Sequence, residues 1–384
     1  MKRQLLGVAA ILLSISTYAQ DNPLWMRYCA ISPDGTTIAF TYKGDIYTVP
    51  STGGRASQIT TNPAHDTKPI WSPDGKKIAF ASDRMGSMDI FEVNKEGGIP
   101  KRLTTHSGNE TPVAYKDAGH ILFLANIMPT AEDAQFPSGQ FQQVYEVNTE
   151  GGRPVLFSSM PMEDISINHT GNTLLYHDKK GYEDPWRKHH TSSITRDIWL
   201  CSLNGNRTFR KQTAFNGEDR TPVWASDDKS FYYLSEEKGS FNIFKRDIDG
   251  NTSKQITNHT KHPVRFLSAA SNGTLCYGYD GEIYTVKEGA IPQKVQISIV
   301  TDKNDKDLIR QIKRSGATEI SLSPDAKEIA FVLRGDVYVT STEYSTTKQI
   351  TNTPQQERDI HFSPDGRSIV YASERNGLWQ IYQT

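Results

Sequence analysis

Two polar stretches of this 384-residue sequence carry the side chains best suited to holding a ligand. Residues 126–142 end with glutamines, whereas residues 177–196 combine aromatic, basic and imidazole groups. An indole can stack on a ligand, and a guanidinium can form paired hydrogen bonds with a carboxylate. The candidate peptide-binding residues are Gln140, Gln142, Tyr182, Trp186, Arg187, His189 and His190. Packing onto its own domain is, however, the commoner fate of such a Trp, and both stretches could instead cover a neighbouring domain of the full protein.

The other residue types that commonly do chemistry predict no active site in this chain. His189 and His190 are adjacent, so their rings diverge, and no Cys or HExxH pattern supports them as metal ligands. No GxSxG sequence marks a nucleophilic serine, and no glycine-rich phosphate-binding loop occurs. We therefore expect no catalytic residue, no metal site and no cofactor within these residues.

The three cysteines, Cys29, Cys201 and Cys276, fall within expected strands. An odd number in one chain leaves at least one thiol free. We expect all three to be small buried hydrophobes rather than parts of a disulfide framework.

A recurring turn sets the elements that must position these residues. The sequence Ser-Pro-Asp-Gly occurs at 32–35, 72–75 and 363–366, each time before a short apolar run, and a near copy occurs at 323–326. Pro presets φ, Asp can accept bonds from nearby backbone N–H groups, and Gly tolerates positive φ, so the chain reverses between two strands. The spacing from Pro33 to Pro73 is 40 residues, and a period of roughly 40–45 residues indicates propeller blades.

The remaining strands of each unit have their own markers. A polar residue followed by an apolar–aromatic pair, as in Asp89-Ile90-Phe91, marks the third strand, and a short run ending in Thr, as at Thr104, marks the fourth. The pattern predicts an all-β fold: a six-bladed β-propeller of four-stranded antiparallel blades over residues 20–297. The two polar stretches are then insertions between the second and third strands of blades three and four, which places them on one face of the propeller.

The rhythm of the blades is interrupted after residue 297. Residues 298–316 are expected to form a linker, and residues 317–384 to form the first two blades of a second propeller, truncated by the end of the sequence. We therefore expect the sequence to be the front portion of a longer protein. A single ring of eight blades is the rival arrangement, but the charged stretch 301–316 would interrupt it.

The N-terminus predicts export. Residues 1–19 combine an early positive charge, an apolar run at 5–15 and small residues near a cleavage point, as a secretory signal peptide does; a disordered tail or a buried helix is the alternative. We expect a periplasmic or secreted protein with no membrane span. With 43 basic and 44 acidic side chains, the chain also lacks the basic excess expected of a nucleic-acid partner.

The repeats resemble the propeller repeats of TolB-type periplasmic proteins, prolyl-oligopeptidase-type enzymes and tricorn-type proteases. The order of signal peptide, six blades, linker and second propeller resembles the N-terminal part of bacterial tricorn-like serine proteases, as do the segments 181–190 and 195–199. This resemblance implies a hydrolase whose catalytic domain lies beyond the chain. It also implies propellers that guide or gate peptides or unfolded polypeptide, with the C-terminal domains of the same protein as partners.

The resemblance also implies basic residues near the blade-three insertion that hold a substrate's terminal carboxylate. Between Ala125 and Gly152 this sequence has neither Lys nor Arg, so only Arg187 on the neighbouring insertion could substitute. A TolB-like periplasmic protein-binding propeller and the propeller of a prolyl-oligopeptidase-type peptidase remain the alternatives. Assembly into a homo-oligomer is left open by the sequence.

Overall fold

The computed structural model contains strands and no helix in the part of the chain that it describes. That part consists of residues 23–126, 141–182, 184, 186–187, 193–300, 313–344 and 346–384. Contacts divide the chain into two compact units, residues 1–301 and residues 302–384. The signal peptide expected at 1–19 lies outside the described residues. The domain boundaries expected from the sequence stay predictions.

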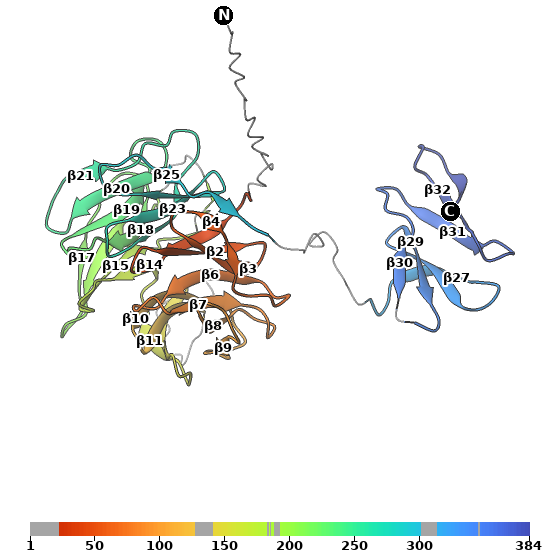
Figure 1. The fold of residues 1–384 in the computed structure, drawn as a ribbon, viewed down its shortest axis with the longest axis horizontal. Coiled ribbons are helices and arrows are strands. Elements are labelled where there is room, and N and C mark those ends of the chain that lie inside the picture. Colours follow the sequence, from red (N-terminus) through yellow and green to blue (C-terminus); the bar gives the residue numbers. More distant parts are fainter. Residues whose placement is uncertain are drawn as a thin grey trace, which may run out of the picture. The chain divides into compact units, whose positions relative to one another are not determined.

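The first unit contains six antiparallel sheets of four strands, each sheet running in chain order (Figure 1). Blades one to three consist of β1 (Arg27–Ile31), β2 (Thr37–Tyr42), β3 (Asp45–Pro50), β5 (Ser57–Gln58), β6 (Asp66–Trp71), β7 (Lys77–Ser82), β8 (Asp89–Asn94), β9 (Lys101–Arg102), β10 (Glu110–Asp117), β11 (His120–Ala125), β12 (Gln143–Asn148) and β13 (Val155–Ser158). Blades four to six consist of β14 (Met162–Ile167), β15 (Thr173–Asp178), β16 (Ile198–Ser202), β17 (Thr208–Lys211), β18 (Asp219–Trp224), β19 (Ser230–Ser235), β20 (Asn242–Asp247), β21 (Ser253–Gln255), β22 (Arg265–Ala269), β23 (Leu275–Tyr279), β24 (Glu282–Val286) and β25 (Gln293–Lys294). The all-β propeller fold predicted from the repeats is confirmed.

The recurring turn folds as its residue types require. Asp74 Oδ1 accepts hydrogen bonds from the Ser72 hydroxyl at 2.7 Å and from the Lys76 backbone N–H at 3.1 Å. Gly75 has φ +68°, a conformation that residues with a Cβ rarely adopt. The turn therefore joins the first and second strands of the blade without help from more distant parts of the chain.

The threonine two residues after the fourth strand links one blade to the next. The Thr104 hydroxyl accepts a hydrogen bond from the Ile90 backbone N–H at 2.9 Å. The same hydroxyl donates to the carboxylate of Glu110, at the start of the inner strand of the following blade. Burial raises the pKa of Glu110 to about 7. The short edge strand is thus held from both sides, although it contributes only two residues to the sheet.

The six blades close into a ring. Each inner strand contacts the inner strand of the next blade, and β22 of blade six contacts β1 of blade one. The chain then adds β26 (Ile297–Ser298), which pairs in parallel with β4 (Gly54–Arg55) at the outside of blade one. A single ring of eight blades is inconsistent with these contacts.

The second unit contains two sheets of the same kind. The first is a four-stranded sheet and the second a three-stranded sheet, each in chain order. The strands are β27 (Ala317–Leu322), β28 (Glu328–Leu333), β29 (Asp336–Ser341), β30 (Thr347–Gln349), β31 (Glu357–Phe362), β32 (Ile369–Ser373) and β33 (Gln380–Gln383). Buried side chains of both sheets, including Val332, Val337 and Tyr371, form one core.

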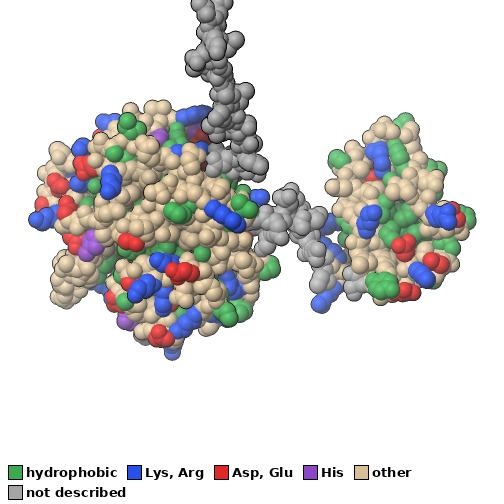
Figure 2. All heavy atoms as spheres, in the orientation of Figure 1, with side chains coloured by type: hydrophobic (Ala, Val, Ile, Leu, Met, Phe, Trp, Pro, Cys, Tyr) green, Lys and Arg blue, Asp and Glu red, His purple; other side chains and the backbone are tan. Residues whose placement is uncertain are grey.

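On the face of the propeller seen in Figure 2, charged side chains do not gather by sign. Figure 2 shows basic and acidic groups interspersed on the visible face of the first unit. Among the described residues, no helix has the length and apolarity that crossing a bilayer requires. The surface therefore gives no reason to revise the expectation against nucleic acid, which the overall charge supports.

A glycine pair tests the contribution of β26 to ring closure. A Cβ on Gly53 would lie 2.7 Å from the Gln296 carbonyl oxygen, whereas a Cβ on Gly54 meets no atom within 4 Å. Both glycines have positive φ, so alanine strains the backbone at either position. We expect Gly53→Ala to lower the free energy of unfolding by about 1–3 kcal/mol more than Gly54→Ala, because only the former displaces the residues that lead into β26. Urea unfolding of the 384-residue chain measures the difference, and equal losses would contradict it.

Candidate functional site

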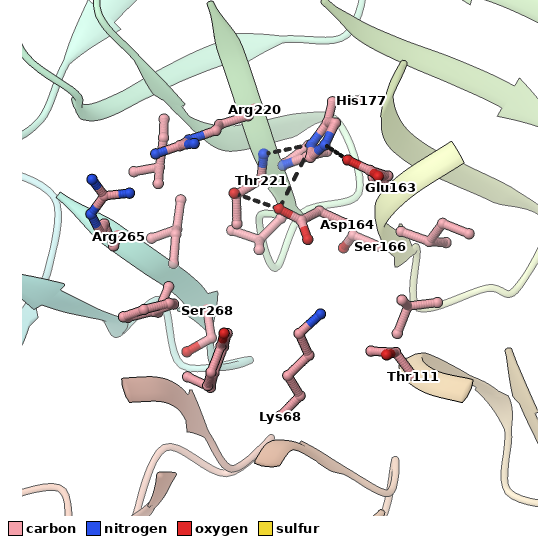
Figure 3. A pocket seen from close by; sticks show the side chains of 18 of the residues that line it. Lys68, Thr111, Glu163, Asp164, Ser166, His177, Arg220, Thr221, Arg265 and Ser268 are labelled. Carbon is pink, nitrogen blue, oxygen red and sulfur yellow. Dashed lines mark hydrogen bonds and ion pairs between the residues drawn. The ribbon is translucent and has the colours of Figure 1, made fainter. Parts of the chain in front are cut away.

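A cavity of about 640 Å³ lies at the centre of the propeller. Its wall includes residues from the innermost strand of all six blades, β1, β6, β10, β14, β18 and β22 (Figure 3). Residues outside the inner strands complete the lining, among them Gln142, His177, Tyr182, Trp186 and Arg196. Because every blade contributes its first strand, each blade forms one side of the same cavity, and the residue types on that strand determine the chemistry of that side.

A β-bulge in the inner strands turns side chains into this cavity. The pairing of the first and second strands shifts register within each inner strand. In five blades the bulge contains a cavity-lining residue with positive φ: Tyr28 (+52°), Lys68 (+53°), Asp164 (+48°), Thr221 (+52°) and Phe266 (+58°). Bulges re-aim a side chain at the cost of local backbone strain. The repeated strain therefore marks the positions that define the cavity wall.

None of these five residues was singled out from the sequence, although their spacing is regular. Each lies five positions before the second residue of the turn that ends its strand, as Lys68 lies before Pro73 and Asp164 before His169. The regularity of this spacing was a usable signal. The spacing can be interpreted only once the structure shows that the bulge directs the side chain at that position into the cavity.

One side of the cavity is acidic and internally paired. Glu163 contacts His177 Nε2 at 3.2 Å and Lys179 Nζ at 2.7 Å. Asp164 accepts a hydrogen bond from the Thr221 hydroxyl at 2.6 Å, and the Thr221 backbone N–H donates to His177 Nδ1 (Figure 3). Burial favours a higher pKa for Glu163, but His177 and Lys179 outweigh it and hold the pKa well below its usual range. These two carboxylates are thus satisfied by the protein itself.

Buried ion pairs fasten the blade-four insertion to blade five. Arg187 donates to Glu218 at 2.6 Å and to Glu236 at 3.0 Å, and its side chain is only 9% exposed. Glu218 also pairs with Arg196 at 2.9 Å. Burial pulls the pKa of Glu218 upward, but the surrounding guanidinium groups outweigh it, so the pKa is lowered. Arg187 therefore serves the protein's own carboxylates.

Trp186, in the same insertion, contacts residues of blades six and one. Its ring centre lies 4.9 Å from the Arg27 guanidinium and 5.1 Å from that of Arg265. Arg265 also donates a hydrogen bond to the Trp186 carbonyl at 2.8 Å, and the Trp186 and Phe266 rings meet edge to face. The tryptophan is 44% exposed and lines the cavity, so packing and ligand contact are compatible for this residue.

Lys68 projects into the cavity from blade two, opposite the acidic side (Figure 3). Its ammonium lies 5.8 Å from the centre of the Tyr28 ring. Within the described ranges no carboxylate lies within 4.0 Å of this ammonium. It differs in this respect from Lys179, which is paired with Glu163.

The predicted peptide-binding residues separate into three groups. Gln142, Tyr182 and Trp186 line the cavity. Arg187 is held by the carboxylates of Glu218 and Glu236, as described above. The others, Gln140, His189 and His190, lie outside the described residues. Ligand contact by any of the seven stays a prediction.

The cysteines have the environment expected of small hydrophobes. Cys29, Cys201 and Cys276 are free and buried, as predicted. Burial raises the pKa of the Cys201 thiol, which disfavours its reactive thiolate form. In the part of the chain that the structure describes, no three His, Cys, Asp or Glu side chains are grouped as metal ligands would be.

The buried arginine gives a testable energetic difference. Replacing Arg187 by Met leaves the carboxylates of Glu218 and Glu236 buried with fewer partners, and we expect a loss of about 3 kcal/mol or more in the free energy of unfolding. The matched control is Arg210→Met, because its 2.8 Å pair with Asp249 joins side chains that are 51% and 88% exposed. That change should cost less than about 1 kcal/mol. Similar losses for both variants in urea unfolding would show that Arg187 does not fasten the insertion.

Comparison with known proteins places the propeller in a family. The family described as "Tricorn protease N-terminal beta propeller domain" matches residues 23–290. The chain is 24% identical to "Tricorn protease homolog 1" of Streptomyces coelicolor over 92% of its own length and 32% of the relative's. It is 27% identical to "Tricorn protease homolog" of Saccharolobus solfataricus, over 73% of this chain and 26% of the relative.

A solved structure shows the same fold. "Crystal structure of the tricorn protease" superposes with a TM-score of 0.62 at 18% sequence identity, covering 94% of this chain and 35% of that one. The chain thus spans about a third of the length of the first relatives that it matches. The family match covers well over half of the chain and includes all six inner strands that line the cavity. The chain therefore belongs to the family of tricorn protease N-terminal β-propeller domains.

Proposed function

We propose that this chain guides or gates peptides for a serine-type catalytic domain that lies beyond it in the same protein. The observation that carries the proposal is the central cavity, to which every blade contributes its inner strand. Family membership supports it, because the relatives that match this chain are tricorn protease homologues about three times its length. The propeller acts in this account as a passage with a selective wall, and hydrolysis takes place elsewhere.

The groups that line the cavity suit contact with a peptide better than bond cleavage. His177 could serve as a base only through a free ring nitrogen, but Thr221 N–H and Glu163 occupy both nitrogens. The hydroxyls of Ser166 and Ser268 accept hydrogen bonds from the backbone N–H groups of neighbouring inner strands. A nucleophile needs a base within hydrogen-bond reach. In the described lining neither serine hydroxyl is hydrogen-bonded to a base, and the Thr221 hydroxyl donates to the Asp164 carboxylate. These polar groups can serve as hydrogen-bond partners for a passing backbone.

Export is part of the same proposal. The early basic residues and the apolar run at 5–15 support a signal peptide that is removed after residue 19. When the protein is expressed in a bacterium with residues 1–19 intact, we expect it to be periplasmic or secreted, with a mature N-terminus near Gln20. Mass spectrometry of the mature protein measures this end. Recovery of a cytoplasmic protein that retains Met1 would contradict export.

Narrowing the cavity tests the passage in the whole protein. Thr111 lies on the cavity wall, and Thr208 is exposed on the outer strand β17, so Thr111→Trp and Thr208→Trp form a matched pair. We expect Thr111→Trp to slow turnover of peptides of about 20 residues several-fold, because a bulky ring obstructs the route, and to leave a short chromogenic substrate unaffected. Thr208→Trp should change neither rate.

The same two substrates are also tested with the isolated 384-residue chain. It should hydrolyse neither substrate. Hydrolysis by this chain would overturn the assignment of chemistry to a later domain. Equal turnover of long peptides by wild type and Thr111→Trp, at equal thermal stability, would overturn the passage.

A further inference from the structure

We propose that Lys68 forms an anion-binding subsite in the central cavity, which takes the side-chain carboxylate of an Asp or Glu in a peptide segment. The inference rests on the proposed passage of peptides and adds a preference for acidic segments. Two observations support it. The Lys68 ammonium lies inside the cavity, and the other charged side chains of the lining are bonded to protein groups.

The backbone holds Lys68 in an unusual conformation that directs it inward. Its φ of +53° lies in the left-handed region, which a residue with a Cβ adopts only when the surrounding structure imposes it. The bulge between Thr67 and Ile70 imposes it here. Figure 3 shows the side chain extended, with its ammonium in the open centre of the cavity. The long stem therefore presents a charge where a passing segment must meet it.

The other charges of the lining are committed to protein partners. Lys179 and Arg196 contact Glu163, and Arg220 contacts Glu218. Arg265 donates to the Trp186 carbonyl and lies over the indole ring. Burial lowers the pKa of Arg220 to about 10, which still leaves its guanidinium charged at neutral pH. Lys68 has neither a hydrogen-bonded nor an ion-paired partner among the described residues. Its positive charge is therefore the one most available to a ligand.

The surroundings of this ammonium favour a carboxylate. Pro69, Ile70 and Pro112 line the wall nearby and limit the screening of charge by water, which strengthens the attraction of an opposite charge. The Thr111 and Ser166 hydroxyls also line the cavity and can donate to the oxygens of an anion. A lysine offers a compact charge without the fixed geometry of a guanidinium, which suits a carboxylate that arrives in varied orientations.

Peptide binding to the 384-residue chain tests the subsite. The probes are fluorescent ten-residue peptides, acetylated and amidated at their ends, that differ only in carrying Glu or Gln at two central positions. We expect wild type to bind the Glu peptide more tightly, with a preference that weakens as salt is added. In Lys68→Met the affinity for the Glu peptide should fall about tenfold, as the loss of one partly desolvated ion pair implies, while the affinity for the Gln peptide stays unchanged.

Two control variants make the result specific. Lys76→Met removes a lysine from the turn of the same blade, where it is 78% exposed, and should keep the preference for Glu. Lys68→Arg restores a positive charge at the bulge and should recover most of the preference. Thermal unfolding of each variant confirms that the fold is retained.

The outcomes separate this inference from the proposed function. If wild type binds both peptides equally, or if Lys68→Met keeps the preference, the acidic subsite is wrong and passage of peptides is unaffected. If wild type binds neither peptide, the subsite is also overturned, and turnover by Thr111→Trp in the whole protein decides the passage independently. Loss of the preference in Lys68→Met and its retention in Lys76→Met support the subsite.

Discussion

Each blade of the propeller must bury apolar side chains on both of its faces, and the rest of the structure depends on this constraint. In β2, Ile38 and Phe40 point toward the core shared with blade six, whereas Ala39 packs into the core shared with blade two. Successive sheets of this kind can all be covered only by one another, so they close on themselves. Closure in turn brings six inner strands around one space. The cavity is a consequence of two-faced sheets.

Charged side chains have different surroundings in the buried interior and at the cavity wall. Deep groups such as Glu218 are surrounded by guanidinium groups and fix the insertion of blade four to its neighbours. Groups at the cavity wall face open volume, and their character changes from blade to blade, with an aromatic ring at Tyr28, an ammonium at Lys68 and a carboxylate at Asp164. One repeated backbone geometry thus carries different chemistry at each position. The scaffold is repetitive, and the cavity that it encloses is asymmetric.

Signals between residues that are near in the sequence were sufficient to predict the blades. The turn at Asp74 and the threonine at Thr104 act within a few residues or between adjacent strands, so their spacing predicts four-stranded units and their number. The cavity wall depends on bulges, which leave almost no mark in residue type, and Lys68 was missed for that reason. Long-range pairs were also out of reach: the carboxylates that hold Arg187 lie 31 and 49 positions away. Of the predicted binding residues, Gln142, Tyr182 and Trp186 do line the cavity, since the insertions of blades three and four could be recognised from their length and composition.

The parallel pairing of β26 with β4 constrains how the molecule is made. Ile297 pairs with Gly54, so the contact joins parts of the chain about 240 residues apart. The Ile38 side of the first sheet packs mainly against blade six, so it has no covering neighbour until that blade has been synthesised. Such distant contacts also make folding slow. Until blade six is complete, the chain is an open arc whose two end sheets each expose an apolar face, which favours aggregation.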